Sequence, residues 1–346
     1  MITFPLSIKN KNILPNHRWH PSVVYLDNPV SGYRWWMAET PFPPHHIEPY
    51  QDRYELPCIH YSKDGKTWLS IPENPIDDIN EVDLLTHNYL SDPHLIYVND
   101  HFECYYRKTF KFDKDRRENT TQLLKKTSVD GFNWSECTII ADLRKDKDLE
   151  IWGEQIISPS VYFDGTIYHC WYVDASGYIC DRHILYTTSK DGISWVKAKR
   201  CSLLGTQEIP WHIDVQYYMG KWQLLCYDHN NHILSHYTSE DGMAFHFDRV
   251  IMRPSKNPFS FRSYRIYRSC SVLFDDVVRI YFSEASNVRA YIGLLETEDY
   301  VKFRFISGRM KAQYILDTIS MSYFVIQRVI NKFKRIIYGK FDKENS

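Results

Sequence analysis

The sequence predicts an all-β fold, a five-bladed β-propeller followed by a C-terminal amphipathic α-helix. Three observations predict it: a turn motif that recurs five times, a pair of strands that recurs with it, and an aromatic-rich composition. The 346 residues include 26 Tyr, 18 Phe and 10 Trp. Because aromatic side chains favour strands, this composition agrees with a protein built almost entirely from sheets.

The turn motif has the form Ser-x-Asp-Gly-x-x-aromatic. Three clear copies and two weaker ones lie at intervals of about 50 to 66 residues, at 62–68, 128–134, 189–195, 239–245 and 297–303. Asp and Ser side chains bond nearby backbone amides, and Gly accepts a positive φ, so the motif is typical of a hairpin turn rather than of a binding site. The spacing suits a four-stranded repeat unit.

A second pattern precedes each turn: a strand, a short polar turn and an aromatic-rich strand. The first strands of the five units begin at His20, Asp92, Ser158, Asp214 and Ser269. Five units of this kind close into a ring that protects its strand edges. We expect residues 1–309 to form the propeller and 310–346 to form a basic helix and tail.

Composition excludes several classes of function. The chain carries 42 Lys and Arg against 43 Asp and Glu, a formal net charge of -1, so it lacks the basic excess of a general nucleic-acid binder. Its eight cysteines have no metal-ligand spacing, which indicates reduced, buried thiols. The first 19 residues show no secretory signal pattern, and we therefore expect a cytoplasmic protein. No cofactor is expected.

One face of the ring collects polar residues. In a propeller, the starts of the inner strands and the ends of the second strands share a face with the longer loops. All five second strands end in a charged residue, namely Glu39, Arg107, Asp174, Asp228 and Glu284. With the inner-strand starts, they predict a polar site at this mouth, where substrate-binding candidates are Trp19, Glu39, Arg107, Ser158, Asp174, His212, Asp228 and Arg268.

At these residues the chain resembles the five-bladed glycosidase group, which includes family 43 glycoside hydrolases, invertase-like enzymes and mannoside phosphorylases. The resemblance covers about residues 16 to 308. It implies an acidic residue before Pro at the start of successive inner strands: a base in blade one, an orienting acid in blade two and a Glu acid in blade three. Asp92-Pro93 matches the second motif. His20-Pro21 and Ser158-Pro159 depart from the other two.

The departures leave the catalytic assignment open. Glycoside cleavage usually needs two carboxyl groups. His20 is a candidate base or a hydrogen-bonding residue, since imidazole titrates near neutrality. The missing acid has several candidates, with slight preference for Glu154. The catalytic candidates are Asp92, His20, Glu154, Asp214 and Glu284.

Two other site hypotheses concern His212 and the arginines. His212 and Asp214 alternate along an extended strand and so share one side. Together with His20 they suggest a metal site, but direct hydrogen bonding to a ligand is the preferred interpretation, and no metal is predicted. Arg107 and Arg268, with Arg262 and Arg265, would hold a carboxylate or phosphate, unless they pair with neighbouring acids.

The sequence of the tail predicts an amphipathic helix, because apolar residues recur at steps of three and four from Ile315 to Ile337. Lys and Arg crowd its second half. Residues 310–340 therefore either pack on protein or contact an anionic membrane surface, and in the second case the protein is peripheral on the inner membrane face.

The sequence therefore predicts a carbohydrate-active enzyme that acts on a glycosidic bond, of glycoside hydrolase type. Two alternatives remain: a membrane-associated glycosyltransferase or phosphorylase of glycan biosynthesis, and a non-catalytic glycan-binding propeller. The expected partner is an oligo- or polysaccharide, with a lipid-linked or nucleotide-activated sugar in the second case, and no nucleic acid.

Overall fold

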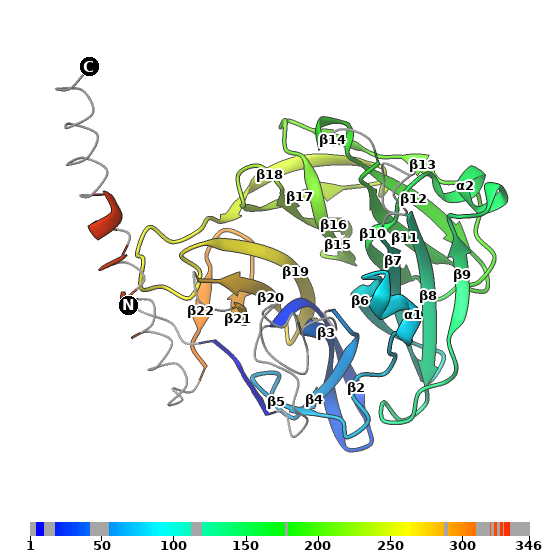
Figure 1. Ribbon diagram of the computed structural model, residues 1–346, viewed down its shortest axis with the longest axis horizontal. Helices are drawn as coiled ribbons and strands as arrows, with labels where there is room; N and C mark the ends of the chain where they lie inside the picture. The colour runs from blue at the N-terminus through cyan, green and yellow to red at the C-terminus, as the bar shows by residue number, and fades with distance from the viewer. Residues whose placement is uncertain are drawn as a thin grey trace.

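Five mainly antiparallel sheets surround a central axis in the computed structural model, which confirms the predicted five-bladed propeller (Figure 1). The structure describes residues 5–9, 18–41, 55–111, 120–176, 179–286 and 290–308, and, in the tail, 319, 322, 323, 326, 327 and 329–332. In every blade the first long strand lies at the axis and later strands follow outward.

The strands of the first two blades have the following bounds. Blade one contains, from the axis outward, β2 (Arg18–Val30), β3 (Tyr33–Pro41), β4 (Cys58–Ser62), β5 (Thr67–Ser70) and β1 (Ser7–Lys9). Blade two contains β6 (Tyr89–Val98), β7 (His101–Phe110), β8 (Thr120–Ser128) and β9 (Thr138–Asp142). Two short helices, α1 (Glu81–Leu85) and α2 (Asp146–Trp152), lead into β6 and towards the third blade.

The remaining three blades repeat the arrangement. Blade three contains β10 (Ile157–Phe163), β11 (Tyr168–Asp174), β12 (His183–Ser189) and β13 (Lys199–Arg200), with a 3₁₀ turn at Ile179–Asp181. Blade four contains β15 (Pro210–Tyr218), β16 (Lys221–Asp228), β17 (Leu234–Ser239), β18 (Ala244–Met252) and β14 (Ser202–Leu204). Blade five contains β19 (Arg265–Phe274), β20 (Val277–Ala285), β21 (Ala290–Thr297) and β22 (Arg304–Ile306).

The N-terminal strand joins the first blade to the last. β1 pairs in parallel with β5 of blade one, while the Leu6 amide donates to the Ile292 carbonyl of β21 in blade five (2.9 Å). Leu6 is buried in a cluster that also contains Trp35, Trp68 and Tyr281 from these two blades. The segment therefore covers backbone and apolar surface at the junction where the ring closes.

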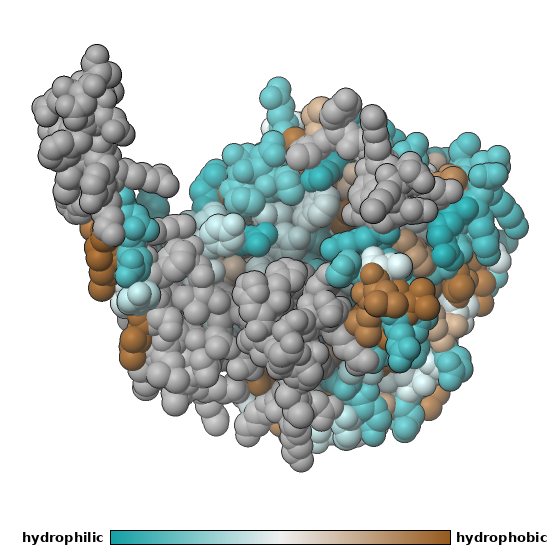
Figure 2. Space-filling view, in the orientation of Figure 1, coloured by the Kyte–Doolittle hydropathy of each residue, from teal (hydrophilic) through white to brown (hydrophobic). Residues whose placement is uncertain are grey.

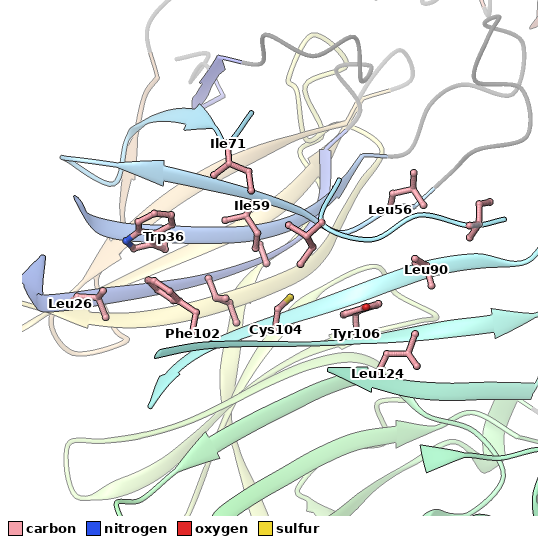
Figure 3. Close-up of a cluster of buried hydrophobic side chains, with 14 residues drawn as sticks. Leu26, Trp36, Leu56, Ile59, Ile71, Leu90, Phe102, Cys104, Tyr106 and Leu124 are labelled. Atoms are coloured by element: carbon pink, nitrogen blue, oxygen red, sulfur yellow. The ribbon is translucent and has the colours of Figure 1, made fainter. Parts of the chain in front are cut away.

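Aromatic and aliphatic side chains fill the space between neighbouring blades. Figure 3 shows the cluster between blades one and two, where Trp36 and Ile59 of one sheet face Phe102, Cys104 and Tyr106 of the next. Trp36 and Phe102 are fully buried, with ring centroids 4.9 Å apart. Most of the aromatic excess in the composition is therefore packing between sheets.

The recurrent Asp-Gly turn is structural, as predicted. In blade two, Asp130 accepts hydrogen bonds from the Phe132 and Asn133 amides, and Ser128 Oγ accepts one from Gly131. The turn also contacts the preceding blade, since the Gly131 Cα hydrogens face the Trp36 ring. Comparable contacts join the turn glycines Gly65, Gly192 and Gly242 to Tyr281, Tyr105 and Trp171 of their preceding blades. The turns therefore fasten each blade to its neighbour.

Each inner strand is irregular where it enters the channel. The register shifts between Trp19 and Ser22 in β2, between Ser91 and His94 in β6, and between Ile157 and Ser160 in β10. His20, Asp92 and Ser158 lie within these bulges and have φ of 57°, 54° and 53°. A positive φ is uncommon for residues with a Cβ, and β-bulges re-aim side chains beside functional sites.

The tail is helical at 329–332 and at its other described positions, which agrees with the predicted C-terminal helix. Ile319, Tyr323, Ile326 and Ile330 are exposed there. None of the helices in the described part of the chain has the length and apolar character required to cross a bilayer. Contact of 310–340 with a membrane surface, and the boundary at 309, stay predictions.

Replacing Gly131 by Ala will destabilise the propeller by about 3 kcal/mol or more, because a Cβ there would lie 2.3 Å from the Trp36 ring and the residue has φ of +79°. Urea denaturation measures the free energy of unfolding. Gly32→Ala is the matched control, since Gly32 has φ of +83° but no atom within 4 Å of the added Cβ. Equal losses in the two variants would contradict the proposed packing contact.

Candidate metal and substrate site

Three buried side chains from different blades meet at the channel axis: His20 on β2, Asp92 on β6 and His212 on β15. Asp92 Oδ1 lies 3.5 Å from His20 Nε2 and 3.5 Å from His212 Nδ1. The two imidazole centroids are 5.0 Å apart. One nitrogen or oxygen from each residue lies within 4.8 Å of the others, so the three groups are able to share one ligand.

The second oxygen of Asp92 is fully engaged. Oδ2 accepts a hydrogen bond from Arg107 Nε (2.6 Å) on β7 and one from the Ser158 amide (3.2 Å) on β10. Arg268 Nη1 of β19 lies 3.8 Å from Oδ1. These contacts come from three blades and fix the carboxylate, so that Oδ1 faces the two histidines.

The atoms that face the centre have no hydrogen-bond partner among the described residues. They are His20 Nε2, Asp92 Oδ1, and both ring nitrogens of His212. His20 Nδ1 instead pairs with Thr40 Oγ1, and in the tautomer in which Nδ1 donates to that hydroxyl, Nε2 carries the lone pair. Buried polar atoms without partners are costly, and so this cluster is suited to an added ligand.

The charge states suit a cation. Burial lowers the pKa of His20 to about 3 and lowers the pKa of His212 well below its ordinary value, although Asp92 opposes both shifts. Burial alone would raise the pKa of Asp92, but its neighbours, Arg107 foremost, hold that pKa well below the usual range. At neutral pH the cluster therefore offers two neutral imidazoles and one carboxylate.

Two histidines and one carboxylate are a donor set of catalytic Zn²⁺ and similar divalent cations, which leave a further position open. Ligand atoms about 2.1 Å from a tetrahedral cation lie roughly 3.4 Å apart, close to the 3.5 Å found here. The residues fit a cation. Direct hydrogen bonding to a ligand, which the sequence favoured, stays a prediction, because each neutral imidazole also carries one N–H that can donate to Asp92 Oδ1 or to a ligand.

A pocket of about 210 Å³ opens beside the cluster. It is lined by Trp19, His20, Glu55, Arg265 and Tyr267. Figure 2 shows this loop-bearing face of the ring, on which mostly hydrophilic atoms surround a central hollow. A second pocket lies between the inner strands at 23–25, 95–98, 161–163, 216–218 and 271–273, and none of its described lining residues is charged. Of these two pockets, only the first has charged side chains in its described lining, and it lies on the face that the sequence predicted.

Glu55 is the carboxyl group that the sequence analysis missed. Its Oε2 atom is buried and has no hydrogen-bond partner within the described part of the chain. Burial raises the pKa of Glu55 to about 7, with the Arg107 charge as the main opposing influence. Glu55 follows residues 42–54, which lie outside the described residues, and precedes β4, where no repeat motif marks it. Only its position between two predicted strands of the first blade was a signal.

The five charges that end the second strands are all buried, but most serve the scaffold. Glu39 pairs with Arg18 and His60 Nε2. Asp174 accepts from the Glu154 and Ser176 amides. Asp228 likewise accepts from the Ile209 and Asn231 amides. Among these five, Arg107 contacts the cluster directly.

The other candidates are spread around the channel. Glu154 is exposed after α2, outside the buried cluster. Glu284 is buried near Arg262, and burial raises its pKa to about 8. Asp214 lies farther along β15 than His212, and accepts from the Ser271 amide (2.9 Å) and hydroxyl (3.0 Å). Trp19 lines the pocket, and Ser158 and Arg268 support Asp92 as described.

The sequence alignment of blades four and five requires a correction. The sequence placed Asp214 and Ser269 at the positions equivalent to His20 and Asp92. In the structure, the register shifts begin before those two residues, between Pro210 and His212 in blade four and between Ile266 and Ser269 in blade five. Tyr267 therefore occupies the bulge of blade five, and His212, not Asp214, reaches the cluster. The shift is invisible in sequence because neither bulge contains the Pro that marks the first three.

Comparison with known proteins supports the fold and its resemblance. No family model matches the chain. The chain is 23% identical over 318 residues to the A type blood N-acetyl-α-D-galactosamine deacetylase of Flavonifractor plautii, which covers 76% of this chain and 39% of that protein. The chain thus spans about two fifths of this relative.

Solved structures share the propeller. A crystal structure of an N-acetylgalactosamine deacetylase from F. plautii with blood group B trisaccharide has a TM-score of 0.69 and 20% identity, covering 86% of this chain and 94% of that one. A GH43_1 enzyme of Xanthomonas citri complexed with xylose has a TM-score of 0.59 and 10% identity, covering 90% and 95%. The predicted likeness to the five-bladed glycosidase group is confirmed, and these similar proteins are enzymes that act on carbohydrates.

The His20–Asp92–His212 cluster will bind one divalent cation per chain. After dialysis with a chelator and return of Zn²⁺, metal analysis of the purified protein is expected to find about one equivalent, with a raised melting temperature because the cation binds the folded state. His212→Ala will lose both effects. His101→Ala, a partly exposed histidine on β7, is the control and will keep them. Equal Zn²⁺ content in the two variants would show that the cation binds elsewhere.

Proposed function

We propose that this protein is a cation-dependent hydrolase that removes the N-acetyl group from an N-acetylated sugar within a glycan. The observation that carries the proposal is the His20–Asp92–His212 cluster, with its unpartnered ligand atoms, next to the Glu55 carboxyl. The F. plautii deacetylases, to which the chain is similar in sequence and fold, support the same reaction.

The proposal explains the departures from the glycosidase motifs. A glycosidase of this group would carry carboxyl groups at positions 20 and 158, where this chain has His and Ser. The retained acid, Asp92, is held ionised by Arg107 and the Ser158 amide, so it is unsuited to protonate a leaving oxygen. Histidine at position 20 instead adds a neutral nitrogen ligand. Asp92 and the histidines at positions 20 and 212 thus suit a cation better than they suit acid-assisted glycoside cleavage.

Each residue then has a definite role. His20, Asp92 and His212 would hold the cation, and a cation bound there would polarise the acetyl carbonyl and make a water molecule more acidic. Glu55 accepts a proton from the attacking water and returns it to the nitrogen as the amide C–N bond breaks. The products are acetate and a sugar with a free amine. Trp19 and Tyr267 offer ring faces against which a sugar can pack.

Glycoside hydrolysis is the second candidate, because Glu55 and Asp92 bring two carboxyl groups close enough for the charge of Asp92 to raise the pKa of Glu55 and because xylosidases share the fold. The glycosyltransferase or phosphorylase and the non-catalytic glycan binder stay predictions, as do cytoplasmic location and membrane contact.

Incubation of the Zn²⁺-loaded protein with N-acetylgalactosamine-terminated and N-acetylglucosamine-terminated oligosaccharides will release acetate and create free amines. Release of reducing ends without acetate would establish the glycosidase instead. Asp92→Asn is expected to abolish acetate release while circular dichroism stays unchanged. Full acetate release by that variant would reject the proposal.

The acetate-releasing activity will depend on pH through Glu55. Because a base must be ionised to accept a proton, kcat/KM is expected to rise with pH through the pKa of Glu55. Burial raises that pKa to about 7 in the metal-free protein and a bound cation lowers it, so the midpoint lies below 7. Glu55→Gln will reduce kcat by roughly 100-fold or more and abolish that limb of the profile, while Zn²⁺ content is kept. An unchanged pH profile in Glu55→Gln would assign the base to another group.

A further inference from the structure

Beside the cluster, two arginines lie on an aromatic surface that is continuous with the pocket. The Arg182 guanidinium lies 4.0 Å from the centroid of the Trp211 ring. Trp211 Nε1 donates to the Tyr267 hydroxyl (2.9 Å), and the Tyr267 ring lies 4.3 Å from that of His212. Arg182 is therefore connected to the candidate site through two aromatic side chains.

Arg265 is the second arginine, and it lies beside Tyr267. Its guanidinium is 5.3 Å from the Tyr267 ring and 5.2 Å from the Trp19 ring, and the residue lines the pocket. Stacking on aromatic rings holds a guanidinium in place while leaving its edge free for planar, bidentate recognition of an oxyanion.

Neither arginine forms an ion pair with any residue that the structure describes. By contrast, Arg18, Arg107 and Arg279 all pair with buried carboxylates. Arg182 Nε, Arg182 Nη1 and Arg265 Nε are buried, and no described residue accepts a hydrogen bond from them. Arg182 thus has a buried Nε–Nη1 edge without an acceptor among the described residues, and Arg265, whose side chain also bonds Tyr227, has an Nε without one. A carboxylate or sulfate would supply these acceptors.

His229 lies between these two charges. Its ring is 5.2 Å from that of Trp211, and its Nδ1 is a buried atom with no partner in the described chain. Burial lowers the pKa of His229, and the charges of Arg182 and Arg265 both add to that shift. The nearby acid, Asp228, is occupied by the Ile209 and Asn231 amides. His229 is therefore neutral at pH 7, and the positive charge of this surface comes from Arg182 and Arg265.

We propose that Arg182, His229 and Arg265, here called the basic rim, bind a carboxylate or sulfate of the substrate, so that the natural substrate is an acidic glycan. The inference rests on the proposed function, because it places the N-acetylated sugar in the pocket beside the cluster. The anionic group belongs to that sugar or to its neighbour, since Tyr267 borders both the pocket and the Trp211 surface.

Binding of matched tetrasaccharides to the Zn²⁺-loaded protein tests the basic rim. The probes are unsulfated chondroitin, in which a uronic acid alternates with N-acetylgalactosamine, its carboxyl-reduced form, and the carboxyl-reduced form with a 4-sulfate. Isothermal titration is expected to find that one or both acidic probes bind roughly tenfold or more tightly than the neutral one. The two acidic probes show whether carboxylate or sulfate is recognised.

The variants Arg182→Gln and Arg265→Gln will each reduce this preference, and the double variant will remove it. Arg144→Gln is the matched control, because Arg144 also stacks on a ring, 4.1 Å from the centroid of Phe110, but lies on blade two near β9; it will keep the preference. Circular dichroism confirms folding, and Arg265→Lys, which preserves the charge, is expected to recover part of the preference.

Equal binding of acidic and neutral probes, or no binding of either acidic probe, would overturn the basic rim. These outcomes are distinct from failure of the proposed function. Acetate release from neutral and acidic probes at equal rates would retain the deacetylase and reject the rim. A preference for an acidic probe that depends on Arg182 and Arg265, without acetate release, would retain the rim and reject the deacetylase.

Discussion

The structure depends on keeping one carboxylate ionised at the centre of a five-bladed ring. Burying a charge is costly unless it is paired and hydrogen-bonded. Asp92 meets that requirement with groups from three blades: Arg107 of its own blade, the Ser158 amide of the next, and Arg268 across the channel. The pairing leaves one oxygen directed at His20 and His212. The site is therefore complete only when the blades are assembled into the ring, because no blade alone provides the partners of Asp92.

The scaffold and the site use different parts of the repeat. The Asp-Gly turns lie towards the outside of each blade, where they are similar in sequence and fasten neighbouring sheets through aromatic contacts. The bulges lie at the inner strands, where the residues differ: His20, Asp92, Ser158 and Tyr267. Five equivalent positions around one axis allow chemically different side chains to meet. Changing a few of them changes the chemistry while the turns preserve the fold.

Related folds show how far the same ring has diverged in chemistry. Solved structures that share it include xylosidases and an N-acetylgalactosamine deacetylase. In this chain the second-blade acid of the glycosidase pattern remains, while the first and third positions have become His20 and Ser158. Under the proposed function, the imidazole of His20 adds a cation ligand where the glycosidase pattern has a carboxylate, and Ser158 holds Asp92 through its backbone amide. The proposed basic rim would add a second, charge-based criterion for the glycan.

The sequence by itself determined the number of blades, the turn chemistry, and the face on which the polar residues gather, because repeats and local hydrogen bonds leave a pattern in the chain. It also singled out His20, Asp92 and His212. Only the tertiary structure decided that these three share one centre, that His212 rather than Asp214 reaches it, and that Glu55 and Arg182 stand beside it. These features depend on how five sheets pack around an axis, and no local sequence pattern records that packing. They are register shifts that no proline marks and contacts between blades far apart in sequence.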